Sequence, residues 1–260
     1  MDSVDTAADT SWQALLEQGR AGEALAYYRL QGDIEEDTLA ALTTLAAVQT
    51  DLRAKAYDRA LKTVTGHETR TPALLDWQHL ETELAQLKTG ADALERRDPE
   101  TAMATIAELD HPLLNPELAT LHGTYSILQD DTEAARAHFE RAFELDPKHY
   151  RALTNLGNLS LEAGEIDAAI ATYERALKLN DSFANAHHNL GVAYRRKGQV
   201  GKSVSALRKA QNVSQKQMRE EARESLKGGM GQGWAKYGRY LLYAGLAFVL
   251  YLVLNARGII

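Results

Sequence analysis

The chain has 260 residues, of which 45% are hydrophobic and 25% are charged, a composition that excludes a wholly disordered protein. It contains no cysteine, so disulfides, thiolate nucleophiles and cysteine-ligated zinc are excluded. The net charge of −7 is unevenly distributed, since residues 1–149 hold 13 basic and 28 acidic side chains and residues 150–260 hold 16 basic and 8 acidic ones.

The composition predicts an all-helical protein, because it has only 5 prolines and many good helix formers. Residues 1–10 are polar, lack the basic and apolar regions of a secretory signal, and are predicted to be disordered. Residues 11–115 contain three short segments typical of a turn followed by a helix. Their aligned alanines, Ala24, Ala60 and Ala102, are unevenly spaced along the chain. We expect about three irregular helical hairpins here; a separate helical domain is the alternative.

Residues 116–217 repeat with a period of 34. Small residues recur in step with large ones, which is expected where paired helices approach closely and each gap is filled by a bulky side chain. The residues of three such columns are Gly123, Gly157 and Gly191; Ala135, Ala169 and Ser203; and Phe139, Tyr173 and Leu207. We therefore predict repeats at residues 116–149, 150–183 and 184–217.

These columns resemble the tetratricopeptide repeat (TPR), most clearly in ALTNLGNLSLEAGEIDAAIATYERALKLN at residues 152–180. The resemblance implies an all-α, TPR-type solenoid of antiparallel helical hairpins, with residues 11–115 as degenerate TPR-like hairpins. Whether those residues continue the same superhelix stays open. Residues 218–227 are strongly polar and are expected to form a capping helix.

The last part of the chain is predicted to enter a membrane. Four glycines in residues 228–233 favour a hinge. No residue from 240 to 256 carries a charge, which indicates a transmembrane helix within residues 234–257. Basic residues gather before this span, so the positive-inside rule places the N-terminal domain in the cytoplasm of a single-pass, tail-anchored protein.

By the same resemblance, the first helix of each repeat lines a concave groove that binds a protein or peptide. The side chains expected there are Arg151, Thr154, Asn158, Asn185, His188, Asn189, Val192, Arg195 and Arg196. Their net basic character suits an acidic or carboxylate-terminated partner. A stricter form of this prediction is a carboxylate clamp made of Asn158, Asn189, Arg219 and Arg223. Arg219 and Arg223 would come from a further repeat frame that starts at residue 218.

Catalysis has little support. The eight histidines form no HExxH or other metal motif, and GxSxG and P-loop signatures are absent. We therefore expect no enzyme activity, no cofactor and no metal site, and no nucleic-acid partner. The sequence predicts a membrane-anchored scaffold that recruits or assembles a partner. Alternatives are a chaperone-docking or organelle adaptor, and a self-assembling TPR scaffold that forms a homo-oligomer.

Overall fold

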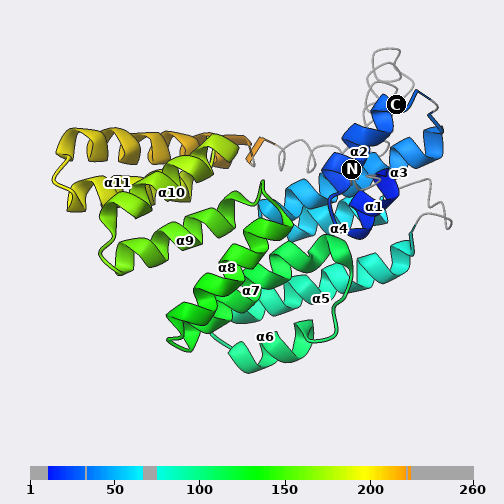
Figure 1. Ribbon diagram of the computed structural model, residues 1–260, viewed down its shortest axis with the longest axis horizontal. Helices are drawn as coiled ribbons and strands as arrows, with labels where there is room; N and C mark the ends of the chain where they lie inside the picture. The colour runs from blue at the N-terminus through cyan, green and yellow to red at the C-terminus, as the bar shows by residue number, and fades with distance from the viewer. Residues whose placement is uncertain (1–10, 33, 67–74, 221, 224–260) are drawn as a thin grey trace, which may run out of the picture. The chain divides into compact units, whose positions relative to one another are not determined.

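The structure is a computed structural model that describes residues 11–32, 34–66, 75–220 and 222–223. All regular structure in these residues is helical, and no strand occurs among them (Figure 1). The elements are α1 (Trp12–Glu17), α2 (Ala21–Leu30), α3 (Glu36–Arg53), α4 (Tyr57–Thr65), α5 (Trp77–Glu95), α6 (Pro99–Ile106), η1 (Pro112–Leu114), α7 (Asn115–Leu128), α8 (Thr132–Leu145), α9 (Tyr150–Glu162), α10 (Ile166–Leu179) and α11 (Ala184–Arg196). The prediction of an all-helical fold is confirmed for the described part of the chain.

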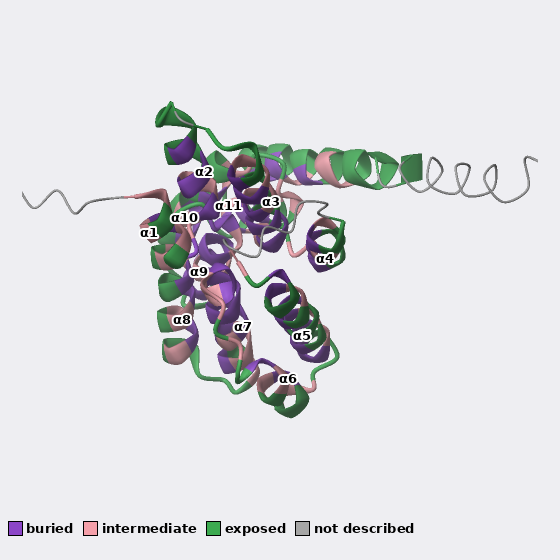
Figure 2. Ribbon diagram, turned by 90° about the vertical axis from the view of Figure 1, so that its right-hand side faces the viewer, coloured by how far each residue is buried: buried purple, intermediate pink, exposed green. Residues whose placement is uncertain are grey.

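The chain divides into two compact units, residues 1–207 and 208–260. In the first unit, consecutive helices pack as hairpins from α1–α2 through α9–α10. Buried residues lie on the helix faces that meet a neighbour, and exposed residues lie on the outward faces (Figure 2). The described residues of the second unit, 208–220 and 222–223, are helical.

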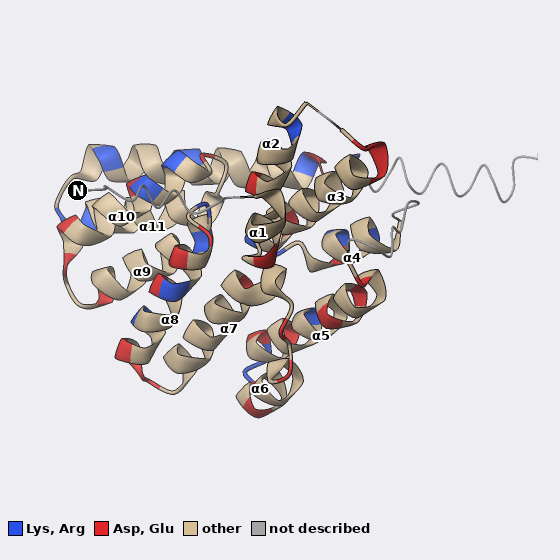
Figure 3. Cartoon of the chain, turned by 45° about the vertical axis from the view of Figure 1, so that its right-hand side comes forward, with Lys and Arg blue, Asp and Glu red and all other residues tan. Residues whose placement is uncertain are grey.

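Several helix starts follow from local sequence. The side chains of Asp76, Asp98 and Asp131 each accept a hydrogen bond from a backbone N–H in the first turn of α5, α6 and α8, at 3.0, 3.2 and 2.9 Å. Such caps satisfy donors that have no partner inside the helix. The first turn of α3 is acidic (red in Figure 3), which suits the positive end of the helix dipole.

The turn inside each hairpin has the same hydrogen bonds throughout the first unit. The residue with positive φ donates its N–H three residues back, and the next residue donates five residues back at 2.8–2.9 Å, which together form a Schellman motif. The residues with positive φ are Gly19, Lys55, Arg97, Asp130, Gly164 and Gly198. The irregular hairpins of residues 11–115 therefore turn in the same way as the regular ones.

Glycines bring the helices of the regular hairpins together. A Cβ atom added to Gly123, Gly157 or Gly191 would lie 2.5, 2.6 or 2.7 Å from the side chain of Phe139, Tyr173 or Leu207 respectively. The same contact occurs one hairpin earlier, where a Cβ on Gly90 would overlap the side chain of Ile106. The close packing of the repeats thus extends to α5–α6.

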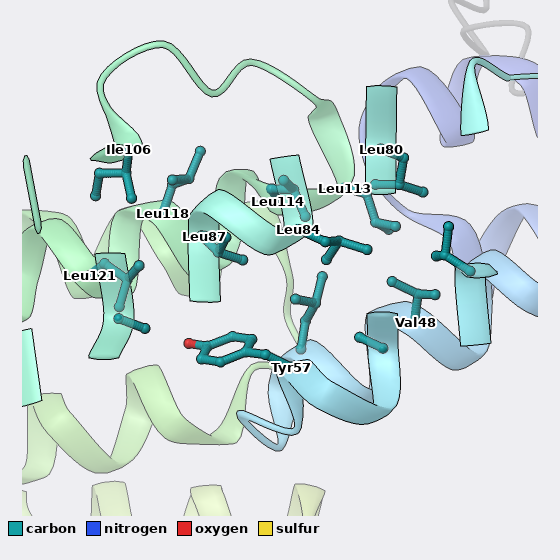
Figure 4. Close-up of a cluster of buried hydrophobic side chains, with 14 of the residues drawn as sticks. Val48, Tyr57, Leu80, Leu84, Leu87, Ile106, Leu113, Leu114, Leu118 and Leu121 are labelled. Carbon is teal, nitrogen blue, oxygen red and sulfur yellow. The ribbon is translucent and has the colours of Figure 1, made fainter. Parts of the chain in front are cut away.

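A continuous core joins the N-terminal hairpins to the first regular repeat. Its buried side chains come from α2 through α7, including Val48 and Tyr57 from α3–α4, Leu84 from α5 and Leu121 from α7 (Figure 4). Residues 11–115 and the repeats up to Leu207 belong to one compact unit. Residues 11–115 therefore belong with the repeats and do not form a domain of their own.

One boundary differs from that expected. Residues 200–220 form one uninterrupted helix, so residues 218–220 continue the second helix of the last repeat and no separate capping helix starts at residue 218. The reason is local, because residues 214–220 contain neither the glycine nor the proline that would end a helix. The expected disordered N-terminus (1–10), glycine hinge (228–233) and transmembrane anchor (234–257) lie outside the described residues.

Candidate functional site

The first helices of the repeats, α7, α9 and α11, carry the side chains predicted to line a groove. The repeat period relates equivalent positions, so Glu117, Arg151 and Asn185 hold the same place near the start of the three helices. Their environments differ sharply. Asn185 is exposed, whereas Glu117 is 1% exposed and the Arg151 side chain is 14% exposed.

Glu117 is the centre of a buried polar cluster. Its carboxylate accepts hydrogen bonds from Arg151 Nη1 at 2.9 and 3.0 Å and from the hydroxyl of Tyr57, and it contacts His149 Nε2 at 3.2 Å. Burial alone would raise the pKa of Glu117, but the charge of Arg151 and the bonds from His149 and Tyr57 outweigh it and lower the pKa to about 2. The group is therefore held as a carboxylate inside the protein.

The α3–α4 corner covers this end of the predicted groove. Arg151 Nη1 also donates to the carbonyl of Leu52 at 3.2 Å, and Arg53 pairs with Asp146 through bonds of 2.5 and 2.8 Å. The prediction that Arg151 faces an open groove is wrong, because its charge is used inside the protein. The hydroxyl of Tyr57, on α4, also donates to Glu117 and so adds to the internal bonding of this cluster.

Thr154 also departs from the prediction. It is 3% exposed, and its hydroxyl donates to the carbonyl of Tyr150 at 2.9 Å. A threonine hydroxyl that bonds back four residues along its own helix is already satisfied. Thr154 therefore cannot contact a partner.

Two predicted asparagines lie together on α9 and α11. Asn189 Nδ2 donates to Asn158 Oδ1 at 2.7 Å, and the hydroxyl of Tyr173 donates to the same oxygen at 2.8 Å. Burial raises the pKa of Tyr173, so the phenol stays protonated and can donate. Both lone pairs of Asn158 Oδ1 are used, which fixes the carboxamide and leaves its Nδ2 group to offer donors to a partner.

A cavity of about 180 Å³ adjoins this pair between α7, α8 and α9. It is lined by Thr124, Ile127, Phe139, Asn155, Asn158, Leu159 and Glu162. The lining mixes polar and apolar groups, with the carboxylate of Glu162 as its charged member. Of the residues predicted to line the groove, only Asn158 contributes to it.

Three residues of the cavity could have been found from the sequence. These residues are Thr124, Asn155 and Glu162. They lie 34 residues before the predicted groove residues Asn158, Asn189 and Arg196 respectively. These positions were not expected, because the groove was predicted from the more regular second and third repeats without the corresponding positions one repeat earlier.

The remaining predicted residues lie on α11. Asn185, His188 and Arg195 are exposed, and Val192 is half-buried. Arg196 is exposed, yet its Nη1 donates to the carbonyl of Leu161 at 2.8 Å, where α9 ends. Cations near a helix C-terminus are stabilised by the helix dipole, so Arg196 has a structural role as well as a surface position.

The residues matched by known protein-family models lie within the hairpins from α7 onward. A TPR repeat model matches residues 157–198, and tetratricopeptide repeat models match residues 138–171, 117–149 and 184–217. Residues 117–217 are tetratricopeptide repeats. No curated protein matches the sequence significantly.

Two solved structures that are similar to this chain illustrate the likeness in fold. "Crystal structure of MamA" is 21% identical, covers 66% of this chain and 96% of its own, and has a TM-score of 0.43. "Crystal structure of YrrB: a TPR protein with an unusual peptide-binding site" is 19% identical, covers 68% of this chain and 88% of its own, and has a TM-score of 0.40.

The TPR hairpins do not extend into the third frame of the predicted carboxylate clamp. A clamp frame starting at residue 218 requires a new first helix there, but the helix of residues 200–220 runs through that position. Arg219 and Arg223 lie in the second compact unit and on helical backbone that follows the last TPR. The clamp is therefore reduced to Asn158 and Asn189, which bond to each other.

Within residues 11–32, 34–66, 75–220 and 222–223, no helix is both long and apolar enough to cross a bilayer.

Proposed function

We propose that this chain is a non-catalytic adaptor that binds an extended segment of a partner protein along the TPR surface formed by α7, α9 and α11. The fixed carboxamide of Asn158 beside the cavity is the observation that carries the proposal. An amide held by two hydrogen bonds loses little side-chain entropy when a ligand binds, and its N–H donors suit the backbone carbonyls of a peptide.

The chemistry of the surface indicates what the segment contains. Ile127, which is 38% exposed, and half-buried Val192 offer contacts for small apolar side chains. Arg195 is exposed and suits an acidic side chain at the α11 end, while Glu162 disfavours one at the cavity. Since Arg151 is internal, the surface is less basic than the sequence suggested, and we propose a mixed rather than a strongly acidic peptide.

We further propose that residues 234–257 hold the adaptor at a membrane, with the TPR repeats in the cytoplasm. The support is the uncharged run at residues 240–256 and the excess of basic residues before it. Alkaline carbonate extraction of membranes from expressing cells tests this part separately. The protein should stay in the membrane pellet, and release into the supernatant would refute the anchor.

Selection from a library of displayed peptides, using the full-length protein in detergent, tests the binding function. A selected peptide should bind at one per chain in fluorescence anisotropy. Asn155→Arg, which fills the cavity, should weaken binding by about ten-fold or more, equivalent to about 1.4 kcal/mol. The matched control is Glu140→Arg on the exposed surface of α8, which should leave the affinity unchanged. Equal affinities for both variants would refute this surface as the binding site.

A further inference from the structure

A group of metal-ligating side chains lies away from the TPR surface, at the start of α5. His79 Nε2 lies 3.3 Å from Glu83 Oε1 and 3.5 Å from Asp110 Oδ1. One donor atom from each of the three residues lies within 4.8 Å of the others. His79 and Glu83 are one helical turn apart on the same face of α5, and Asp110 follows α6.

The two separations from His79 Nε2 match edges of a tetrahedral metal site. Zinc lies about 2.0–2.2 Å from imidazole nitrogen and carboxylate oxygen, so neighbouring ligand atoms in a tetrahedron are about 3.3–3.5 Å apart. The same separations are long for hydrogen bonds between a ring nitrogen and a carboxylate, which are best near about 2.7–2.9 Å when charged. The geometry fits three ligands around a shared ion better than a strong direct ion pair.

The surrounding structure holds the donors in place. Glu83 is 3% exposed, and its two oxygens accept the backbone N–H groups of Asp110 and His111 at 3.1 and 3.0 Å. These bonds fix the segment that carries Asp110 against α5. Each carboxylate oxygen keeps a second lone pair, so Glu83 can bond to the backbone and ligate an ion together.

We propose that His79, Glu83 and Asp110 bind a divalent transition-metal ion, best matched by Zn²⁺, with water in the fourth position. One imidazole and two carboxylates suit zinc, whereas Mg²⁺ and Ca²⁺ favour sites made only of oxygen. The ion links α5 to the segment between α6 and η1 and thereby stabilises the third hairpin. No sequence motif announced it, because Asp110 lies 27 residues beyond Glu83.

Cobalt titration of the untagged, chelator-treated full-length protein tests the site, since tetrahedral Co²⁺ gives a characteristic intense visible absorption. We expect one Co²⁺ per chain, displaced by Zn²⁺, and a higher melting temperature with Zn²⁺ than without. His79→Ala on α5 and Asp110→Asn in the segment between α6 and η1 alter exposed side chains and should each weaken binding by roughly ten-fold or more. His188→Ala removes an exposed histidine elsewhere and serves as the matched control.

The proposal is overturned if the wild-type protein gives no tetrahedral Co²⁺ spectrum, or if His79→Ala and Asp110→Asn bind as tightly as His188→Ala. Circular dichroism checks that each variant is folded. If one variant loses helicity, the other still decides the result, because the two changes are in separate segments. Failure here would leave the proposed peptide-binding surface untouched.

Discussion

Arg151 and Glu117 hold the same position in successive repeats, and their side chains form a buried ion pair at 2.9 Å. A position that recurs in each repeat thus forms a buried contact between two successive repeats. Tyr57 and the carbonyl of Leu52 complete the contact from the α3–α4 corner, which lies far away in sequence. The cluster joins the N-terminal hairpins to the TPR repeats and closes one end of the surface that the repeats present.

Removing the cation from this cluster should be costly. Arg151→Ala leaves the carboxylate of Glu117 buried without its main counter-charge, so the free energy of unfolding should fall by about 3–5 kcal/mol. The matched control, Arg195→Ala, removes an exposed arginine and should change it by less than about 0.5 kcal/mol. Urea unfolding of the full-length protein measures both, and similar values for the two variants would show that the cluster contributes nothing.

The cluster also predicts a pH dependence. The pKa of Glu117 is about 2 in the folded protein against 4.5 ordinarily, so its contribution to stability is complete above about pH 4.5 and is lost as the pH falls toward 2. Glu117→Gln should be less stable than the wild type at neutral pH, and the difference should shrink in acid. Urea midpoints measured from pH 7 to pH 3 test this. Glu162→Gln, at an exposed carboxylate, is the control; a constant difference between Glu117→Gln and wild type would contradict the assignment.

Much of the fold could be predicted from the sequence, because close helix pairing requires a glycine opposite a bulky side chain. Gly157 and Tyr173 show the contact directly, and the repeat period reproduces it in the neighbouring hairpins. The equivalent pair Gly90 and Ile106 was missed. Gly90 stands one position out of step with the glycine column, and the alanines before it are unevenly spaced, so a search at a fixed period passes over this pair.

The candidate site was less predictable. The resemblance to the TPR placed Asn158 and Asn189 on groove-lining helices, and the structure brings their side chains into contact, which depends only on the spacing of adjacent repeats. The resemblance failed for Arg151, whose surroundings depend on where the α3–α4 corner packs. Contacts between hairpins distant in sequence leave no periodic signal. The group formed by His79, Glu83 and Asp110 was missed for the same reason.

Substitutions at two equivalent turn positions should change the free energy of unfolding in opposite directions. Gly164 has φ of 80°, and Asp130 takes the equivalent place in the preceding hairpin with φ of 58°. A Cβ added to Gly164 meets no atom within 4 Å, so Gly164→Ala should lose about 1–2 kcal/mol through backbone strain alone. Asp130→Gly should gain up to about 1 kcal/mol, because it relieves the same strain.

Thermal unfolding of the two turn variants checks the Schellman geometry. The melting temperature should fall for Gly164→Ala and rise for Asp130→Gly. A rise for Gly164→Ala together with a fall for Asp130→Gly would mean that the entropy of the unfolded chain, rather than the left-handed conformation, controls stability at these turns.

Glycine-to-alanine changes inside helices distinguish packing from helix propensity. In Gly157→Ala the new methyl would lie 2.6 Å from Cε1 of Tyr173, a ring that is fully buried, so α9 and α10 must separate. Overpacking of this kind should lower the free energy of unfolding by about 1–3 kcal/mol. Gly201→Ala is the matched control in the helix of residues 200–220, where a methyl would meet no atom within 4 Å.

Gly201→Ala should raise the free energy of unfolding by about 0.5–1 kcal/mol, because alanine is the better helix former. The same chemical change is therefore expected to have opposite effects at two helical positions. Chemical denaturation of both variants, with m-values compared to the wild type, provides the measurement. If Gly157→Ala were also stabilising, glycine would not be needed for the close approach of α9 and α10, and the periodic glycine column would have another origin.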